Sequence, residues 1–193
     1  KMKIYQPAED SYLLQETLSK QFAKRDTLSS ANKEIPNSLI KNANLKFLEI
    51  GIGSGIQLRT AKKLGLKNKN ILGVDINLEA VKYCKKLNFF CKKSNLLEKV
   101  KGKFDFIIFN PPYLPEDKRE PKESRIATTG GKLGGEIINQ FLQQAKKHLE
   151  KNGKIFLLVS NLTKGIKWGN WKKKKIAEKK VFYETLKVYE LRQ

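Results

Sequence analysis

The sequence predicts an α/β protein built on one mostly parallel sheet, with helices on both faces and an antiparallel hairpin at the carboxyl end. Between residues 45 and 159, short apolar runs typical of buried strands alternate with segments whose apolar residues recur at helical spacing. After residue 175, two strand-like segments follow one another too closely for a crossover helix, so they must pair antiparallel. A chain of 193 residues, 39% of them hydrophobic, suffices for one well-buried core, so we expect a single domain.

Residues 1–44 are expected to hold one helix and a polar linker. Pro7 and then Asp10 or Ser11 are typical of a helix start. Apolar residues recur behind them at helical spacing: Leu13, Leu14, Leu18 and Phe22. Residues 26–44 are rich in Ser, Asn and Lys and include Pro36, which indicates a linker with room for one short helix.

Residues 45–193 form the expected core. Its parallel strands are predicted at residues 45–50, 70–75, 89–91, 104–109 and 154–159, and its helices at residues 56–64, 78–87 and 137–149. The closing hairpin is predicted at residues 176–183 and 185–191. Before it, we expect the lysine run at 172–175 to be a solvated loop, while Trp168 and Trp171 either stack on nucleotide bases or cap the edge of the sheet.

The charge of the chain admits two interpretations. Lys and Arg number 40 against 19 Asp and Glu, so the formal net charge is +21, which favours RNA or an RNA-bound protein as a partner. Most of this excess is lysine spread over nearly every segment, which is also typical of a solvated surface without a polyanionic partner. The alternatives stay open at this point.

Few residue types suited to metals or disulfides are present. Cys84 and Cys91 are the only cysteines and His148 is the only histidine, so neither a disulfide framework nor a Cys/His zinc site is expected. We expect His148 to lie late in a helix, near the negative end of its dipole. Without a signal peptide or an apolar run of about 20 residues, the chain is expected to be soluble and cytoplasmic.

A glycine-rich turn follows the first core strand and has the character of a cofactor site. Gly51, Gly53 and Gly55 allow backbone N–H groups to approach a ligand closely. Their spacing departs from the Gly-x-Gly-x-x-Gly pattern of dinucleotide-binding sites. Counted from Gly51, that pattern requires its third glycine at residue 56, where this chain has Ile56. Glu49 places a carboxylate near the same crevice, which suits a cationic ligand better than a pyrophosphate.

Two further strand ends offer contacts for a nucleoside. Asp75 closes the second core strand, where a carboxylate can accept both ribose hydroxyls, although Asp75 is equally compatible with a simple helix cap. After the third strand, Asn95 and Leu96 offer a polar contact and an apolar face for an adenine ring. The sequence therefore predicts that three successive strand ends line one nucleoside.

Asn110, Pro111, Pro112 and Tyr113 directly follow the most apolar strand and indicate chemistry at a planar nitrogen. An amide or aromatic amine is a poor nucleophile, and it improves when acceptors hold its hydrogens. The Asn110 side-chain oxygen and the Pro111 carbonyl can be those acceptors, and the prolines fix the backbone that aims them. Tyr113 can stack on the planar group and lie near a sulfonium charge, so transfer of a methyl group would need only alignment and electrostatics.

These motifs together resemble the HemK family of S-adenosylmethionine-dependent methyltransferases. The resemblance is carried by residues 5–11 (Tyr-Gln-Pro-Ala-Glu-Asp-Ser), residues 49–55, Asp75, residues 110–113 and residues 178–180, and so covers nearly the whole chain. Residues 7–11 are specific to the archaeal and eukaryotic branch, which methylates the glutamine of the Gly-Gly-Gln loop of class-1 release factors. The resemblance implies one Rossmann-like class I methyltransferase domain with a seven-stranded sheet.

The resemblance also implies a role for individual residues. S-adenosylmethionine, which leaves as S-adenosylhomocysteine, would be bound by Ser11, Glu49, Gly51, Gly53, Gly55, Asp75, Asn95, Leu96 and Asn110. The target amide would be held by Asn110, Pro111, Pro112 and Tyr113. Asn95 stands where the family usually has an acidic residue, which predicts weaker cofactor binding. A small zinc-binding activator protein, docked along a sheet edge, is the implied partner.

Three functions are compatible with these features. The first is methylation of the N5 amide nitrogen of a release-factor glutamine. The second is methylation of an exocyclic amine of a nucleic acid, adenine N6 or guanine N2, although a chain of this length has no room for a separate target-recognition domain. The third is a non-catalytic RNA-binding or scaffold protein, against which the intact acceptors at Asn110 and Tyr113 argue.

Overall fold

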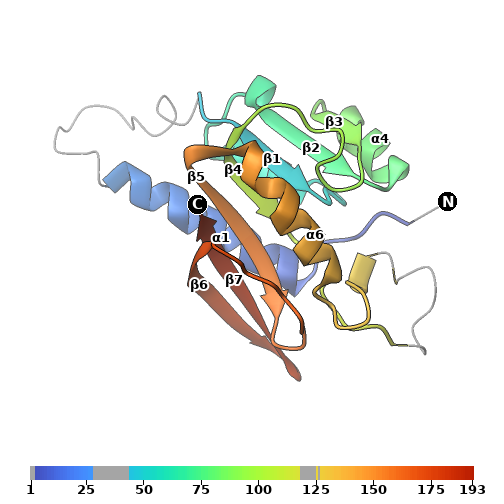
Figure 1. The fold of residues 1–193 in the computed structure, drawn as a ribbon. Coiled ribbons are helices and arrows are strands. Elements are labelled where there is room, and N and C mark those ends of the chain that lie inside the picture. Colours follow the sequence, from blue (N-terminus) through green and yellow to red (C-terminus); the bar gives the residue numbers. More distant parts are fainter. Residues whose placement is uncertain (1–2, 28–43, 118–124, 126) are drawn as a thin grey trace.

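A computed structural model of the chain describes residues 3–27, 44–117, 125 and 127–193, and it contains one seven-stranded sheet (Figure 1). The strand order is β3-β2-β1-β4-β5-β7-β6, with β1 to β5 parallel and the last two strands antiparallel. The strands are β1 (Phe47–Ile50), β2 (Ile71–Asp75), β3 (Phe90–Lys93), β4 (Phe104–Phe109), β5 (Leu149–Ser160), β6 (Lys172–Val181) and β7 (Glu184–Arg192). The predicted α/β class, parallel core and final hairpin are thus confirmed.

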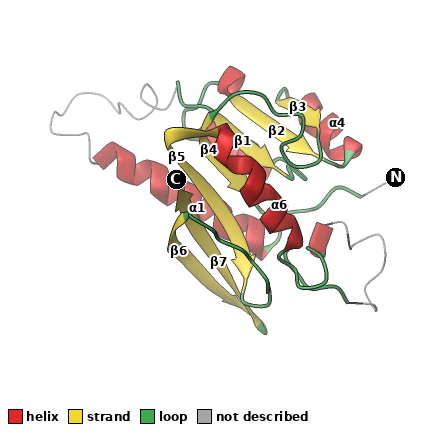
Figure 2. Cartoon of the chain, in the orientation of Figure 1, coloured by secondary structure: helices red, strands yellow, loops and turns green. Residues whose placement is uncertain are grey.

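Helices cover both faces of this sheet (Figure 2). The described helices are α1 (Glu9–Thr27), α3 (Ile56–Lys63), α4 (Leu78–Lys86) and α6 (Glu136–Ala145), with short 3-10 helices at Asn68–Asn70 and Lys146–His148. One buried cluster joins α1, α3 and α4 to one face of the sheet, and a second joins α6 to the other face. In β4, Phe106 belongs to the first cluster and Phe109 to the second, as expected of a strand buried on both sides.

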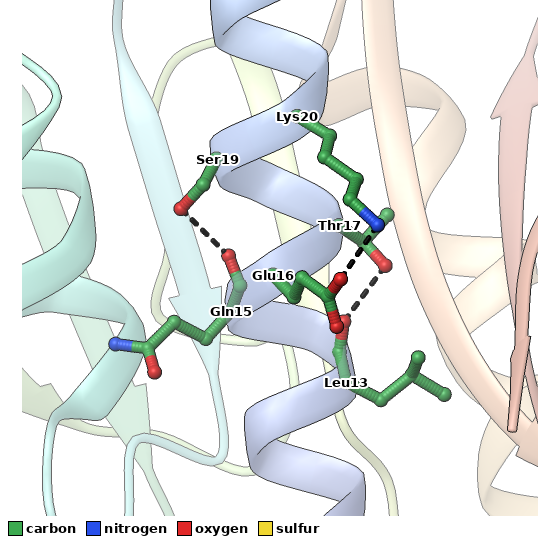
Figure 3. Close-up of polar contacts among 6 residues, drawn as sticks. All are labelled: Leu13, Gln15, Glu16, Thr17, Ser19 and Lys20. Carbon is green, nitrogen blue, oxygen red and sulfur yellow. Dashed lines mark hydrogen bonds and ion pairs between the residues drawn. The ribbon is translucent and has the colours of Figure 1, made fainter.

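Helix α1 forms where the sequence predicts it and packs across the carboxyl-terminal half of the sheet. Within the helix, the Thr17 hydroxyl donates to the Leu13 carbonyl at 2.7 Å, and Lys20 pairs with Glu16 on the exposed side (Figure 3). The Gln15 side chain donates to the Thr60 hydroxyl of α3 at 2.9 Å. This last contact, together with the buried apolar residues of α1, attaches the amino-terminal helix to the core. Residues 28–43, most of the predicted linker, lie outside the described part of the chain.

The boundary between α6 and β5 differs from the prediction. The helix ends at Ala145, and β5 already begins at Leu149, five residues earlier than residue 154. Leu149 pairs with Phe104 of β4 across a register shift, so a long-range pairing extends the strand. His148 consequently lies in a 3-10 helix instead of late in the α-helix, and its Nδ1 is 3.0 Å from the Gly102 carbonyl oxygen.

The hairpin also extends further than predicted. The lysine run 172–175 belongs to β6, which corrects the expectation of a loop, although all four side chains are exposed. β6 pairs with β7 from Lys172 to Val181, with one register shift at Ile176, so ladder hydrogen bonds outweigh the polar composition. Trp171 is buried in the α6-side cluster, and the Trp168 ring lies 5.2 Å from the Tyr189 ring. Both tryptophans therefore pack against the sheet near its β6 edge.

Candidate active site

A cavity of about 340 Å³ opens at the carboxyl ends of the parallel strands. The strand order reverses between β1 and β4, and this is where an open parallel sheet forms a ligand crevice. The predicted site residues that line the cavity come from five separate segments: Ser11, Glu49, Gly51, Gly53, Asp75, Asn95, Leu96, Asn110, Pro111 and Pro112. The structure therefore brings the two predicted motifs and the nucleoside contacts together.

Two predicted site residues do not line this cavity. Gly55 has φ +75°, and a Cβ at this position would come within 2.8 Å of the Cys84 sulfur. The absence of a side chain at Gly55 therefore allows α4 to pack under residues 51–55, here called the glycine loop. The half-buried Tyr113 packs against both core clusters, and its carbonyl accepts a hydrogen bond from the Thr163 hydroxyl at 2.9 Å. Burial also raises the pKa of the Tyr113 phenol.

Asp75 anchors the glycine loop. One carboxylate oxygen accepts from the Gly53 backbone N–H at 3.0 Å, and the other accepts from the Asn77 N–H at 2.7 Å. Burial raises the pKa of Asp75, although these N–H bonds act in the opposite direction. The Asn77 side chain in turn caps α4 by accepting from the Glu79 N–H. Asn77 is therefore the N-terminal capping residue of α4, and Asp75 is not. Asp75 is instead one of the residues that line the cavity.

Glu49 is a buried carboxylate in the floor of the site. Its side chain accepts a hydrogen bond from the Leu58 N–H in the first turn of α3, at 3.0 Å, and the residue is only 4% exposed. Burial raises the pKa of Glu49 well above its usual range, and the neighbouring Cys84 and Asp75 contribute in the same direction. A cationic ligand beside Glu49 would favour its ionised form.

The opposite end of the cavity has the predicted apolar and amide contacts. The Asn95 Nδ2 donates to the Glu98 carboxylate at 2.7 Å, so Asn95 keeps its oxygen as the free acceptor. Leu96 is buried and adopts φ +46°, a left-handed backbone conformation that is uncommon for a leucine. Such strained positions cluster at ligand sites.

Asn110 lies at the end of β4, beside the glycine loop. A Cβ on Gly51 would lie 3.8 Å from the Asn110 carbonyl oxygen, so the two loops run close together. The Asn110 Nδ2 donates to Asp10 at 3.0 Å. Its Oδ1 is buried and has no hydrogen-bond partner among the residues that the structure describes. An unpartnered acceptor in a cavity wall is the kind of group that a donor ligand satisfies.

Besides the predicted Ser11, the amino-terminal segment contributes residues to the site that the sequence patterns did not single out as site residues. Figure 1 shows the chain before α1 passing the carboxyl ends of the strands. Lys3, Tyr5 and Asp10 line the cavity, and the Lys3 carbonyl accepts from the Asn77 side chain at 3.0 Å. Gln57 also lines it and donates to the Ser11 carbonyl at 2.9 Å. Tyr5 and Asp10 belong to the quoted motif of residues 5–11, so the motif was the available signal.

Comparison with known proteins identifies the family. Residues 21–168 match the family described as methyltransferase small domain, which is more than half of the chain. The chain belongs to this methyltransferase family. The methyltransferase is 40% identical over 171 residues to a Methanocaldococcus jannaschii protein to which N5-glutamine methyltransferase activity is provisionally ascribed, covering 83% of this chain and 74% of that one. It is 28% identical to mouse methyltransferase HEMK2, covering 81% and 71%.

A solved structure agrees on the fold. The methyltransferase superposes on the structure of the E. cuniculi Mtq2-Trm112 complex with a TM-score of 0.70 at 20% identity, covering 98% of each chain. The expected class I methyltransferase fold and HemK resemblance are thus confirmed, and S-adenosylmethionine is the cofactor of this family. Within the described ranges, no helix is long and apolar enough to cross a membrane, and no three His, Cys, Asp or Glu side chains form a metal cluster.

Proposed function

We propose that this methyltransferase modifies the N5 amide nitrogen of the glutamine in the Gly-Gly-Gln loop of a class-1 release factor. The observation that carries the proposal is that Asn110, whose buried Oδ1 has no partner among the described residues, lines a cavity that is also lined by Glu49 and Asp75. Carboxylates suited to a cationic nucleoside and an acceptor suited to an NH₂ group thereby share one cavity.

The residues of the cavity fit S-adenosylmethionine. When bound, this cofactor supplies a methyl group on a positively charged sulfur. Asp75 would accept the ribose hydroxyls, Asn95 and Leu96 would border the adenine, and Glu49 would lie under the ribose and methionine. Ser11 would contact the methionine carboxylate end, and Gly51 and Gly53 would form the floor. Gly55 would act through the packing of the loop, since it faces Cys84.

Residues 110–113, here called the acceptor loop, would activate the target amide. The Oδ1 of Asn110 and the Pro111 carbonyl would accept the two hydrogens of the glutamine NH₂ group, which draws the nitrogen lone pair out of conjugation. The nitrogen lone pair would take the methyl group that the cofactor supplies, with the neutral thioether as the leaving group, and the nitrogen would release one proton to water. Pro112 would hold the loop backbone, and Tyr113, which packs against both core clusters, would fix the end of the loop.

The protein substrate is supported by the relatives, whose names refer to N5-glutamine or release-factor glutamine methylation. The similar E. cuniculi complex is described as responsible for methylation of the translation termination factor eRF1. A nucleic-acid amine remains the second candidate, because the net charge of +21 favours polyanions and the same acceptors suit adenine N6 or guanine N2. The basic surface is also consistent with action near RNA or the ribosome, in the cytoplasm.

The free edge of the sheet supports a protein partner. β3 is an edge strand, and apolar side chains of β3, of α4 and of the residue that caps the C-terminus of α4 are exposed around it: Leu78, Tyr83, Leu87 and Phe90. Phe90 has the largest exposed fraction of these, 58%. Because the similar structure is a complex with a second protein, we propose that a small zinc-binding activator pairs with this edge.

Transfer of labelled methyl groups tests the function. The methyltransferase is incubated with labelled S-adenosylmethionine and purified release factor, total RNA or DNA, each with and without the activator. We expect label in the release factor that disappears when the loop glutamine is replaced by asparagine. Label confined to RNA or DNA would support the second candidate instead. Label that survives replacement of the glutamine would contradict the proposed target residue.

A further inference from the structure

Asp10 lies in the first turn of α1 and reaches the acceptor loop, 100 residues away in the sequence. Its Oδ2 accepts from the Asn110 Nδ2 at 3.0 Å and from the Tyr5 hydroxyl at 2.8 Å. Its Oδ1 accepts from the backbone N–H and the hydroxyl of Ser11. The residue is only 6% exposed, so this carboxylate is held from both sides in a buried position.

This contact selects one orientation of the Asn110 amide. The oxygen and NH₂ ends of an amide have nearly the same shape, so either end fits the same space. An ionised carboxylate only accepts hydrogen bonds, and it therefore pairs with the NH₂ end and repels the oxygen. The orientation observed leaves Oδ1 of Asn110 as the unpartnered acceptor of a residue that lines the cavity.

We propose that Asp10 is a positioning residue that holds the Asn110 amide with its oxygen available to the nitrogen being methylated. The inference rests on the proposed function, because it requires a target nitrogen that carries hydrogens. Tyr5 supports the arrangement from the other side. Burial and the adjacent Asp10 raise the pKa of the Tyr5 phenol, so its hydroxyl stays protonated and continues to donate to the carboxylate.

Asp10→Asn tests the proposal because asparagine has only one side-chain oxygen. In the wild type, one oxygen of Asp10 accepts from Asn110 and Tyr5 and the other accepts from Ser11. When the new NH₂ group faces Asn110, the Asn110 amide must turn and its oxygen leaves the substrate side. We expect kcat to fall about 10- to 100-fold, with cofactor affinity unchanged. Glu9→Gln is the matched control, since it removes the same charge from the exposed neighbour that pairs with Lys179, and it should retain full activity. Equal rates for Asp10→Asn and Glu9→Gln would overturn the proposal.

A double-mutant cycle separates positioning from a general structural role. If Asp10 acts through Asn110, then adding Asp10→Asn to Asn110→Ala should slow transfer no further than Asn110→Ala alone. Losses that multiply would overturn the proposal. Tyr5→Phe is the second variant, in case Asp10→Asn does not fold: it removes one donor to the same carboxylate oxygen and should lower kcat less, again only when Asn110 is present.

A spectroscopic measurement makes the test independent of the substrate. The side-chain amide signals of Asn110, assigned by their loss in Asn110→Ala, are compared by ¹H–¹⁵N NMR in the free protein. We expect them to shift in Asp10→Asn and not in Glu9→Gln. Unchanged signals in Asp10→Asn would overturn the positioning role whatever the substrate is. A wild-type enzyme that methylates no glutamine would contradict only the proposed function.

Discussion

Among single residues, Glu49 lowers the stability of the fold while it places a carboxylate at the candidate cofactor cavity. Its carboxylate is buried and accepts a hydrogen bond from the Leu58 N–H. Burial raises its pKa in the folded protein, so the folded chain retains a proton that the unfolded chain has released. The free energy of unfolding must therefore fall as the pH rises from the unfolded pKa toward the folded one.

Glu49→Gln should remove this pH dependence and still accept from Leu58. Relative to the wild type, we expect the variant to gain on the order of 1 kcal/mol or more between about pH 5 and pH 8, because one unit of pKa difference corresponds to about 1.4 kcal/mol. Urea unfolding at both pH values measures the gain. Glu79→Gln, on the surface of α4, controls for the lost charge. A difference in unfolding free energy between Glu49→Gln and the wild type that does not change with pH would contradict the raised pKa of Glu49 as the cause.

Asn110, assigned by the family resemblance to both the cofactor and the target amide, is expected to contribute more to transfer than to holding the cofactor. Asn110→Ala removes the free Oδ1 acceptor, so transfer should slow by about 100-fold or more. Cofactor affinity, measured by isothermal titration calorimetry, should stay close to that of the wild type, because Asp75 and the glycine loop are untouched. Unchanged turnover would exclude the role proposed for this side chain.

At the level of elements, the glycine loop joins β1, α3 and α4. Gly55 precedes α3 in a left-handed conformation, and the Cys84 sulfur of α4 occupies the space that a side chain at residue 55 would need. The conformation of the glycine loop, which forms the cavity floor, therefore depends on the packing of α4 beneath it as well as on the requirements of ligand binding.

Gly55→Ala should accordingly destabilise the fold by more than its backbone conformation alone explains. Gly102→Ala is the matched control, because Gly102 also has a positive φ, +85°, but nothing lies within 4 Å of its added Cβ. Each substitution should cost about 1–2 kcal/mol for the left-handed backbone, and Gly55→Ala about 1–3 kcal/mol more for the contact with Cys84. Urea unfolding measures both, and equal losses would contradict the packing argument.

For the whole molecule, the dominant electrostatic feature is the net charge of +21. Like charges spread over the surface repel one another and oppose the compact state. Raising the ionic strength from about 0.01 M to 0.15 M shortens the Debye length from about 30 Å to about 8 Å, which screens this repulsion. Salt should therefore stabilise the protein.

We expect the melting temperature to rise with added sodium chloride, by about 2–4 °C for each kcal/mol gained. Replacing the exposed Lys172 and Lys174 of the edge strand β6 with glutamine should raise the melting temperature at low salt and weaken its salt dependence. Calorimetry of both proteins over the same salt range makes the comparison. A melting temperature that falls with salt would show that attractive ion pairs outweigh the repulsion.

Local patterns in the sequence were sufficient for the order of strands and helices along the chain and for ten of the residues that line the candidate cavity. Apolar periodicity predicted α1 and β4, and turn chemistry predicted the glycine loop and residues 110–113, because both signals depend on neighbouring residues. The early start of β5 was not predictable in this way, since Leu149 becomes part of a strand by pairing with the distant Phe104.

Long-range geometry accounts for what the patterns missed. The Asp10 contact with Asn110 and the Gly55 contact with Cys84 each join segments whose distance depends on packing across the sheet. Equally, Tyr113 is the last residue of the predicted motif, but it packs against both core clusters instead of lining the cavity. Residue types near one another in sequence predict which chemistry is available, whereas orientation depends on contacts between distant elements, which no local pattern encodes.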